Sequence, residues 1–385
     1  MYRIFDKQKS PLIKKGKSNE KQRGAVIICH TPFQILNALN FLTSKQEELG
    51  KDNIIYISHE FAEAGEYSQR LRQTGLFHAV VDVIPFNHYE GIKHKLIALK
   101  RYVFPEYSLK KHLKTEIHEN LRNNYKYLIF SIHSPLVSII RLLYPHTDII
   151  MIDDGIGSYF GNILTDNPSK LFRIIAKYSF GGALWMNPKA LYLNSVDISQ
   201  TTMNCEIYKL SAFKNNEKLM KLTKFVFNYE QSDEYNIHRL VYLDQPIEFP
   251  NSNYDANYIG LWKLVEKTGF GAQIIVRPHP RQKNANYLYY QQKINNLWEL
   301  ECINTIKNSH ILMGIFSTAQ FMPQILTSSE SAVIFLYRLL LNESMYDFKQ
   351  YDSLVDCLKK IYNAPEKIYV PQSLEELEKC LKDLF

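Results

Sequence analysis

Several common signatures are absent from this chain of 385 residues, and each absence narrows its class. No HExxH motif and no clustered His and Cys pattern indicates a zinc site. No GxGxxG or GxxxxGK[ST] motif is present, so neither a dinucleotide site nor a P-loop is expected. No apolar run approaches the roughly 18 residues of a membrane span. The chain has five cysteines, in odd number and without CxxC spacing, which is typical of reduced thiols in a cytoplasmic protein.

The first 24 residues are basic and lack the apolar core of a signal peptide. They carry much of the formal net charge of +7 through Arg3, Lys7, Lys9, Lys14, Lys15, Lys17, Lys21 and Arg23. We interpret this segment as a disordered arm that touches anionic lipid at the inner face of the cell membrane. A solvated leader with no partner explains it equally well. A nucleic-acid partner is not expected, and a homodimer is left open.

The composition is that of a soluble globular protein, with 45% hydrophobic and 22% charged residues. A chain of this length is too long for one ordinary core, which predicts two domains. The aromatic fraction of 13% is high. Aromatic rings suit the faces of sugars, although core filling explains the same excess.

Apolar runs alternate with helical patterns through the first part of the chain, which predicts a parallel sheet covered by helices. The predicted strands are Ala25–Cys29, Asn53–Ser58, Val80–Pro85, Tyr127–Ile132 and Asp148–Ile152. The predicted helices start at Pro32, behind Thr31 as N-cap, and cover Ser68–Thr74 and Lys93–Asn124.

A second alternation follows a mixed region at residues 160–235, in which Lys214–Lys218 is interpreted as a connection. Its predicted strands and helices are Arg239–Leu243, Ala256–Thr268, Gln273–Val276, Tyr287–Lys293, His310–Gly314, Ala332–Tyr337 and Ser373–Phe385. The sequence therefore predicts domains at 25–235 and 236–385. The predicted class is α/β, in the GT-B arrangement of two Rossmann-like domains that face a central cleft.

The most distinctive motif is Arg277-Pro278-His279-Pro280-Arg281, directly after the Gln273–Val276 run. Pro280 lacks an N–H and Pro278 restricts the residue before it, so the strand cannot continue. The histidine is therefore held at the carboxyl end of a strand, where open α/β sheets bind ligands. With two neighbouring arginines it suits an anionic group such as a phosphate.

Five segments place polar residues at strand ends: His30–Gln34, Asp153–Gly157, Asp244–Glu248, Pro278–Arg281 and Phe316–Ala319. The last opens a predicted helix, where free N–H groups, the helix dipole and hydroxyls could bind a phosphate. Simple N-capping by Ser317 or Thr318 is the alternative. Asp153-Asp154-Gly155 fits a turn and a site equally well.

In their order and spacing, the segments at His30, Asp153, Arg277 and Phe316 resemble the bacterial sialyltransferases of glycosyltransferase family 52, the lipooligosaccharide and capsule sialyltransferase group. The resemblance spans most of the chain. Glu299 and Ser317 follow His279 at spacings similar to those of the family's ribose-binding glutamate and phosphate-binding serine.

The resemblance implies inverting, metal-independent transfer of sialic acid from CMP-sialic acid to a sugar hydroxyl, with galactose the first choice, on a bacterial surface glycan. No cofactor is expected. His279 would be the general acid at the departing phosphate. The other residues expected at the donor are Arg277, Pro278, Pro280, Arg281, Glu299, Ser317 and Thr318.

The general base is expected at a carboxylate that the family carries at or just beyond a strand-end proline. Here Ile247 follows Pro246, so Glu248 is the predicted base and Asp244 the alternate. The residues expected on the acceptor side are His30, Thr31, Gln34 and Asp154.

Two other functions compete with this hypothesis. A GT-B transferase with another donor, such as a glucosyl donor, or a polysialyl transferase would keep much of the same pattern. A glycan-binding protein without activity would show no turnover, and His279→Ala would leave its binding intact.

Overall fold

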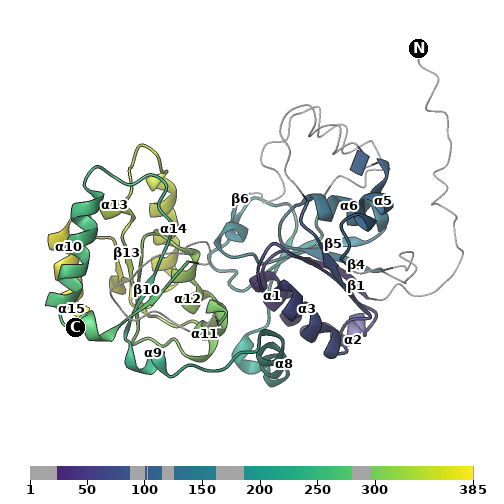
Figure 1. Cartoon of the computed structure of the whole chain (residues 1–385), viewed down its shortest axis with the longest axis horizontal. Helices are drawn as coiled ribbons and strands as arrows, with labels where there is room; N and C mark the ends of the chain where they lie inside the picture. Colours follow the sequence, from purple (N-terminus) through teal and green to yellow (C-terminus); the bar gives the residue numbers. More distant parts are fainter. Residues whose placement is uncertain are drawn as a thin grey trace, which may run out of the picture.

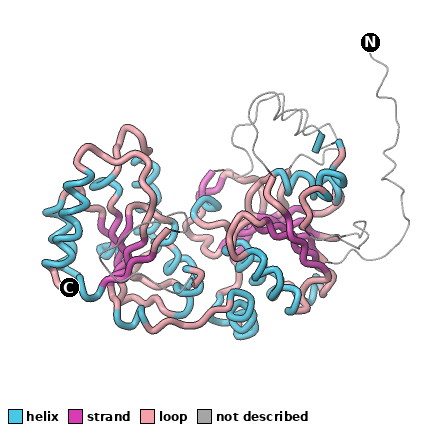
Figure 2. The backbone as a smooth tube through the Cα atoms, viewed as in Figure 1, coloured by secondary structure: helices cyan, strands magenta, loops and turns pink. Residues whose placement is uncertain are grey.

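The computed structural model describes residues 24–86, 100–101, 103–114, 125–161, 186–279 and 296–384. Within them the chain forms two parallel β-sheets, each flanked by helices, in two lobes that follow one another along the chain (Figures 1 and 2). The arm at 1–23, the predicted helix Tyr287–Lys293, and the residues Pro280 and Arg281 lie outside the described residues.

The first sheet has the strand order β3-β2-β1-β4-β5-β7-β9, with every pair parallel. The strands are β1 (Ala25–Cys29), β2 (Ile54–Ser58), β3 (Ala79–Val83), β4 (Tyr127–Phe130), β5 (Asp148–Ile152), β7 (Ala190–Leu193) and β9 (Glu206–Lys209). The order reverses between β1 and β4, and this reversal is the switch point at which Rossmann-like sheets bind ligands.

Helices and 3₁₀ turns connect these strands and pack beside the sheet (Figure 1). They are α1 (Pro32–Ser44), α2 (Gln46–Leu49), α3 (Ala64–Gln73), α5 (Pro105–Lys110), α6 (Pro135–Leu143), η1 (Ile156–Tyr159), η3 (Phe213–Asn215) and α8 (Glu217–Phe227). A small parallel pair, β6 (Phe160–Gly161) and β8 (Gln200–Thr201), lies outside the main sheet.

The second sheet has the order β11-β10-β12-β13-β14, again with every pair parallel. The strands are β10 (Leu240–Leu243), β11 (Ile274–Arg277), β12 (Ile311–Gly314), β13 (Ala332–Phe335) and β14 (Ile368–Tyr369). The surrounding helices and turns are α9 (Glu234–Ile237), α10 (Tyr254–Lys267), η4 (Phe270–Gln273), α11 (Trp298–Asn304), η5 (Thr318–Gln320), α12 (Met322–Thr327), α13 (Tyr337–Leu340), α14 (Phe348–Ile361), η6 (Pro365–Lys367) and α15 (Leu374–Leu384).

The prediction of two Rossmann-like domains is confirmed, and local signals explain much of it. The β1 run Ala-Val-Ile-Ile-Cys is buried along its whole length, as a parallel strand covered on both faces requires. Each fully buried Ile side chain contributes about 1.5–3 kcal/mol to folding. Helix α1 begins where Thr31 accepts a hydrogen bond from the Gln34 N–H and Pro32 supplies the first helical φ.

Two predictions of local structure are wrong. The segment Lys214–Lys218 is not a connection, because Glu217 begins α8, an amphipathic helix that packs against α1 and α3. The stretch Lys93–Asn124 is not one long helix in its described part. There α5 begins at Pro105 and ends at Lys110, and Leu113 then forms a β-bridge with Val83.

The mixed region also contains β7 and β9, which extend the first sheet. The strand β9 has all four residues exposed, so it has no apolar pattern to reveal it. The predicted strand Ala332–Tyr337 ends at Phe335, because Tyr337 begins α13.

The carboxyl edges of the two sheets approach each other. A methyl group placed on Gly155, just after β5, would lie 3.9 Å from Met322 Cε at the start of α12. In the segment between the sheets, Tyr229 donates from its hydroxyl to Glu301 of α11 at 3.1 Å. Among the described residues, no helix is both long and apolar enough to cross a membrane.

Candidate functional site

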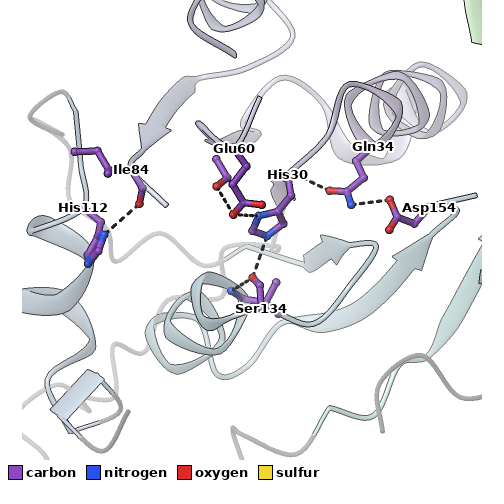
Figure 3. Close-up of polar contacts among 9 residues, drawn as sticks. His30, Gln34, Glu60, Ile84, His112, Ser134 and Asp154 are labelled. Atoms are coloured by element: carbon purple, nitrogen blue, oxygen red, sulfur yellow. Dashed lines mark hydrogen bonds and ion pairs between the residues drawn. The ribbon is translucent and has the colours of Figure 1, made fainter. Parts of the chain in front are cut away.

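His30 lies at the switch point of the first sheet and joins three strand ends (Figure 3). It directly follows β1, and its Nε2 lies 2.9 Å from the hydroxyl of Ser134, beyond β4. Its Nδ1 lies 3.1 Å from Oε1 of Glu60, beyond β2. Only 6% of the His30 side chain is exposed, against 48% for Glu60. The imidazole is therefore held from both nitrogens.

A short chain of hydrogen bonds leads from His30 to Asp154 (Figure 3). The backbone N–H of His30 donates to Gln34 Oε1 at 2.6 Å, and Gln34 Nε2 donates to Asp154 Oδ1 at 2.7 Å. Gln34 is fully buried, so its amide holds both partners in fixed positions. Thr31 takes part only as the N-cap of α1. Three of the four predicted acceptor-side residues thus form one connected group.

The two adjacent carboxylates after β5 have different environments. Asp153 is fully buried and accepts hydrogen bonds from Tyr159, from the Gly155 N–H at 2.8 Å, and from both the backbone and the side chain of Asn194. It therefore anchors the turn to β7.

Asp154 has fewer partners and a shifted pKa. The pKa of its carboxyl is raised to about 6, mainly by burial and also by the neighbouring Asp153, while the Gln34 hydrogen bond and His30 oppose the shift. A carboxylate with a pKa close to neutrality can take up a proton during a reaction.

At the second sheet, the register aligns the ends of β10, β11 and β12, since Leu243 pairs with both Arg277 and Gly314. The segments after these strands therefore lie side by side. Gln245 confirms this, because its Oε1 accepts from the Phe316 N–H at 3.0 Å.

The two predicted bases differ in exposure. Asp244 is largely buried directly after β10, and its N–H donates to the Arg277 carbonyl at 3.1 Å. Glu248 is exposed, and no partner for its side chain occurs among the described residues. Glu248 therefore has no described contact that would fix the direction of its side chain.

Arg277 is engaged inside the second domain. Its guanidinium donates to the Asn296 carbonyl and, at 3.3 Å, to the Tyr235 hydroxyl, and it lies 5.2 Å from the centre of the Trp298 ring. Pro278 and His279 follow it at the strand end, both partly buried. The arginine thus fixes the start of α11 beside the histidine segment.

Glu299 lies in the first turn of α11 and is mostly buried, so it is not a surface carboxylate. Burial raises the pKa of its carboxyl, and Asp153 of the other sheet raises it further. Its own backbone N–H and Arg277 act in the opposite direction. Its neighbour Glu301 has a different role, because it accepts hydrogen bonds from Asn296, Tyr229 and Thr305.

Ser317 is an N-cap, as the alternative interpretation predicted. Its hydroxyl accepts from the Ala319 N–H at 3.2 Å, and its own N–H donates to Gln320 Oε1 at 3.0 Å, which completes a capping box. The helix behind it is only the short turn η5, and Thr318 is exposed. The Ser317 hydroxyl accepts in this cap, so its O–H remains able to donate a hydrogen bond to another group.

Sequence reasoning missed Glu60 and Ser134. Both lie just beyond buried strands, the same position that singled out His30. Ser134 precedes Pro135 and caps α6, the same signal that marks Thr31-Pro32, so the sequence did carry a signal for it. Glu60 has no neighbouring proline or glycine to single it out. No group of three or more His, Cys, Asp or Glu that could hold a metal ion occurs in the described part of the chain.

No family model matches this chain, and no curated protein matches it. Solved structures with a similar arrangement include the UDP-GlcNAc 2-epimerase from Methanocaldococcus jannaschii, with 12% identity, coverage of 93% of this chain and 92% of that one, and a TM-score of 0.49. The E. coli heptosyltransferase WaaC with ADP-2-deoxy-2-fluoro heptose has 10% identity, coverage of 94% and 98%, and a TM-score of 0.37. Structures with so little sequence identity and such low TM-scores say nothing about the donor or the reaction of this protein.

Proposed function

We propose that this protein is an inverting glycosyltransferase that uses a nucleotide-sugar donor, with CMP-sialic acid as the first choice. The observation that carries the proposal is Asp154, a partly buried carboxyl with a pKa of about 6 at the edge where the two Rossmann-like sheets approach each other. Such a group suits the removal of a proton from an acceptor hydroxyl.

In this reaction Asp154 accepts the proton of the sugar hydroxyl while the hydroxyl oxygen attacks the anomeric carbon of the donor. The bond from that carbon to the phosphate oxygen breaks, and the nucleotide leaves as a phosphate anion. His279, held at the end of β11, would donate a hydrogen bond or a proton to that phosphate. The Ser317 hydroxyl would donate to the same group.

The base assignment therefore moves from Glu248 or Asp244 to Asp154. Two properties support the move: the raised pKa of Asp154, and its fixed direction through Gln34. Glu299 keeps its proposed role as a hydrogen-bond acceptor for the ribose, because it is a mostly buried carboxylate close to the histidine segment. The preference for a sialyl donor rests on the resemblance of the sequence motifs to family 52.

The first experiment is thermal-shift stabilisation by CMP, CDP, UDP and GDP without added metal. A nucleotide at about 100 times its dissociation constant stabilises the native state by roughly 2.7 kcal/mol. Selective stabilisation by CMP supports the sialyl donor, and selective stabilisation by UDP replaces it with another sugar donor. No response to any nucleotide would favour the glycan-binding protein. Turnover in EDTA is expected to equal turnover with magnesium.

A further inference from the structure

Exposed large apolar side chains gather beside α5 in the first domain. Val103, Phe104 and Tyr107 fall within five residues of the chain and are 48%, 56% and 48% exposed. Large apolar groups that are exposed together, rather than singly, mark an interaction surface.

The opposite side of this segment is anchored to the first sheet. Leu109 is fully buried, and the His112 ring stacks on Phe86 with centroids 3.8 Å apart. The Ile84 N–H donates to the His112 carbonyl at 2.7 Å, and His112 Nδ1 lies 3.1 Å from the Ile84 carbonyl. The exposed side chains are therefore presented by a fixed support.

Basic residues surround the apolar group. Residues 100–114 contain five Lys or Arg and a single acidic residue, Glu106. Lys100 and Lys111 lie 5.7 and 4.6 Å from the centre of the Tyr107 ring, one on each side of it in the chain. Apolar and aromatic groups among lysines match a bilayer surface, where rings sit at headgroup level and ammonium groups meet anionic lipid.

We propose that Val103, Phe104 and Tyr107, together with Lys100, Lys110 and Lys111, form a docking surface for an anionic lipid membrane. This surface is separate from the basic arm at residues 1–24, and it does not depend on the transferase assignment. Charge complementarity selects the occupant, because neutral lipid would give Lys100 and Lys111 no counter-charge and would leave Lys110 with Glu106 alone. A nucleic-acid backbone would leave Val103 and Phe104 exposed to water.

The surface lies at the same edge of the sheet as the candidate site. Ile84 directly follows the carboxyl end of β3, and His30 directly follows the carboxyl end of β1 in the same parallel sheet. Both contacts appear in one view (Figure 3). A chain docked through α5 would hold the His30 edge near the membrane surface.

The test is co-sedimentation of the full chain with phosphatidylcholine vesicles, with and without phosphatidylglycerol, in the absence of any sugar donor. We expect binding only to the anionic vesicles. Phe104→Ser should weaken it roughly tenfold, because one buried aromatic group is lost from the interface. Phe104→Trp should retain it, since Trp favours the interface. Lys110→Glu with Lys111→Glu should weaken it by at least about 25-fold, at about fivefold per lysine.

Matched controls come from α8, which also carries an exposed aromatic residue and exposed lysines. Phe225→Ser, and Lys221→Glu with Lys224→Glu, make the same chemical changes on a different helix and should leave binding unchanged. The proposal is overturned if the wild type does not bind anionic vesicles, or if the α5 variants bind as well as the wild type. It also fails if the α8 variants lose binding to the same extent.

Discussion

At the carboxyl edge of the second sheet, polar groups largely bond to one another: Arg277 to Asn296 and Tyr235, Gln245 to Phe316, and Ser317 to its own turn. At the edge of the first sheet, fixed hydrogen bonds hold a carboxyl that titrates near neutrality. Both edges are built from residues that follow buried parallel strands.

The difference separates two roles of polar groups at strand ends. Groups whose hydrogen bonds are satisfied internally set the shape of a site, whereas a partly buried carboxyl with a raised pKa is available for proton transfer. Most polar groups described at the second edge are of the first kind. Asp154, at the first edge, is of the second kind.

Asp154→Asn should have the largest effect, because it removes the proposed base while keeping the size and the hydrogen bond to Gln34. General base catalysis contributes about 10²- to 10⁴-fold, so turnover should fall by roughly 10³-fold. In the wild type, turnover should decline as the pH falls through about 6, where Asp154 becomes protonated. A pH–rate profile checks both expectations. A variant close to wild-type turnover would return the base to Asp244 or Glu248.

His279→Ala tests the other side of the comparison. Loss of the hydrogen bond or proton to the departing phosphate should lower turnover by roughly 10²-fold or more. The circular dichroism spectrum and the thermal midpoint should stay near those of the wild type, because His279 is only partly buried. Near-native turnover in a folded variant would remove this histidine from the chemistry.

Asp154→Asn should also stabilise the protein at pH 8. The folded pKa of about 6 lies above the ordinary value of 3.8. The native state therefore binds more protons than the unfolded chain between these two values, and stability falls as the pH rises through that window. Removing the charge should raise the free energy of unfolding by about 2–3 kcal/mol at pH 8.

Urea denaturation at pH 8 and at pH 4 measures this difference, which should shrink to near zero at the lower pH. If Asp154→Asn and the wild type have equal free energies of unfolding at both pH values, burial does not perturb the pKa of this carboxyl. The result would then remove the contrast between the two sheet edges.

Ser134→Ala should destabilise the protein more than Thr31→Ala, although both residues are N-caps in the same domain. Loss of either cap costs about 1 kcal/mol. Ser134 also bonds to the buried His30 ring, so its loss leaves a ring nitrogen without that partner and costs about 1 kcal/mol more. Urea denaturation of the two variants compares them, and equal losses would mean that His30 does not depend on Ser134.

Glu248→Gln should have the smallest effect. An exposed side chain without a described partner changes stability by less than about 0.5 kcal/mol. We expect turnover and the free energy of unfolding to match those of the wild type. Loss of transfer with nucleotide binding preserved would instead support the assignment made from the position of Glu248 after Pro246.

Local signals predicted the repeating part of the fold well. The β1 and β10 strands are apolar runs that only a covered parallel sheet can accommodate, and Thr31-Pro32 marks the start of α1. Local signals failed to predict β9, whose exposed residues have no apolar pattern, and α8, whose first residues are polar. Pro105 indicates a break in the predicted Lys93–Asn124 helix. The charged residues along this segment nevertheless favoured one continuous helix.

The candidate site shows the same division. Polar residues after strands pointed to His30, Asp154, His279 and Ser317, but not to their partners. Glu60 and Ser134 come from strands far from His30 in the chain, and only the order β2-β1-β4 makes them its neighbours.

The sequence by itself determined two parallel α/β domains and a rigid histidine at a strand end, because apolar runs, caps and prolines act over a few residues. Only the tertiary structure distinguished the surroundings of the candidate carboxylates. The pKa of Asp154 depends on burial and on Asp153, Gln34 and His30, and the exposure of Glu248 depends on where its loop lies. Burial and electrostatic contact arise from packing between distant segments, which no local pattern encodes.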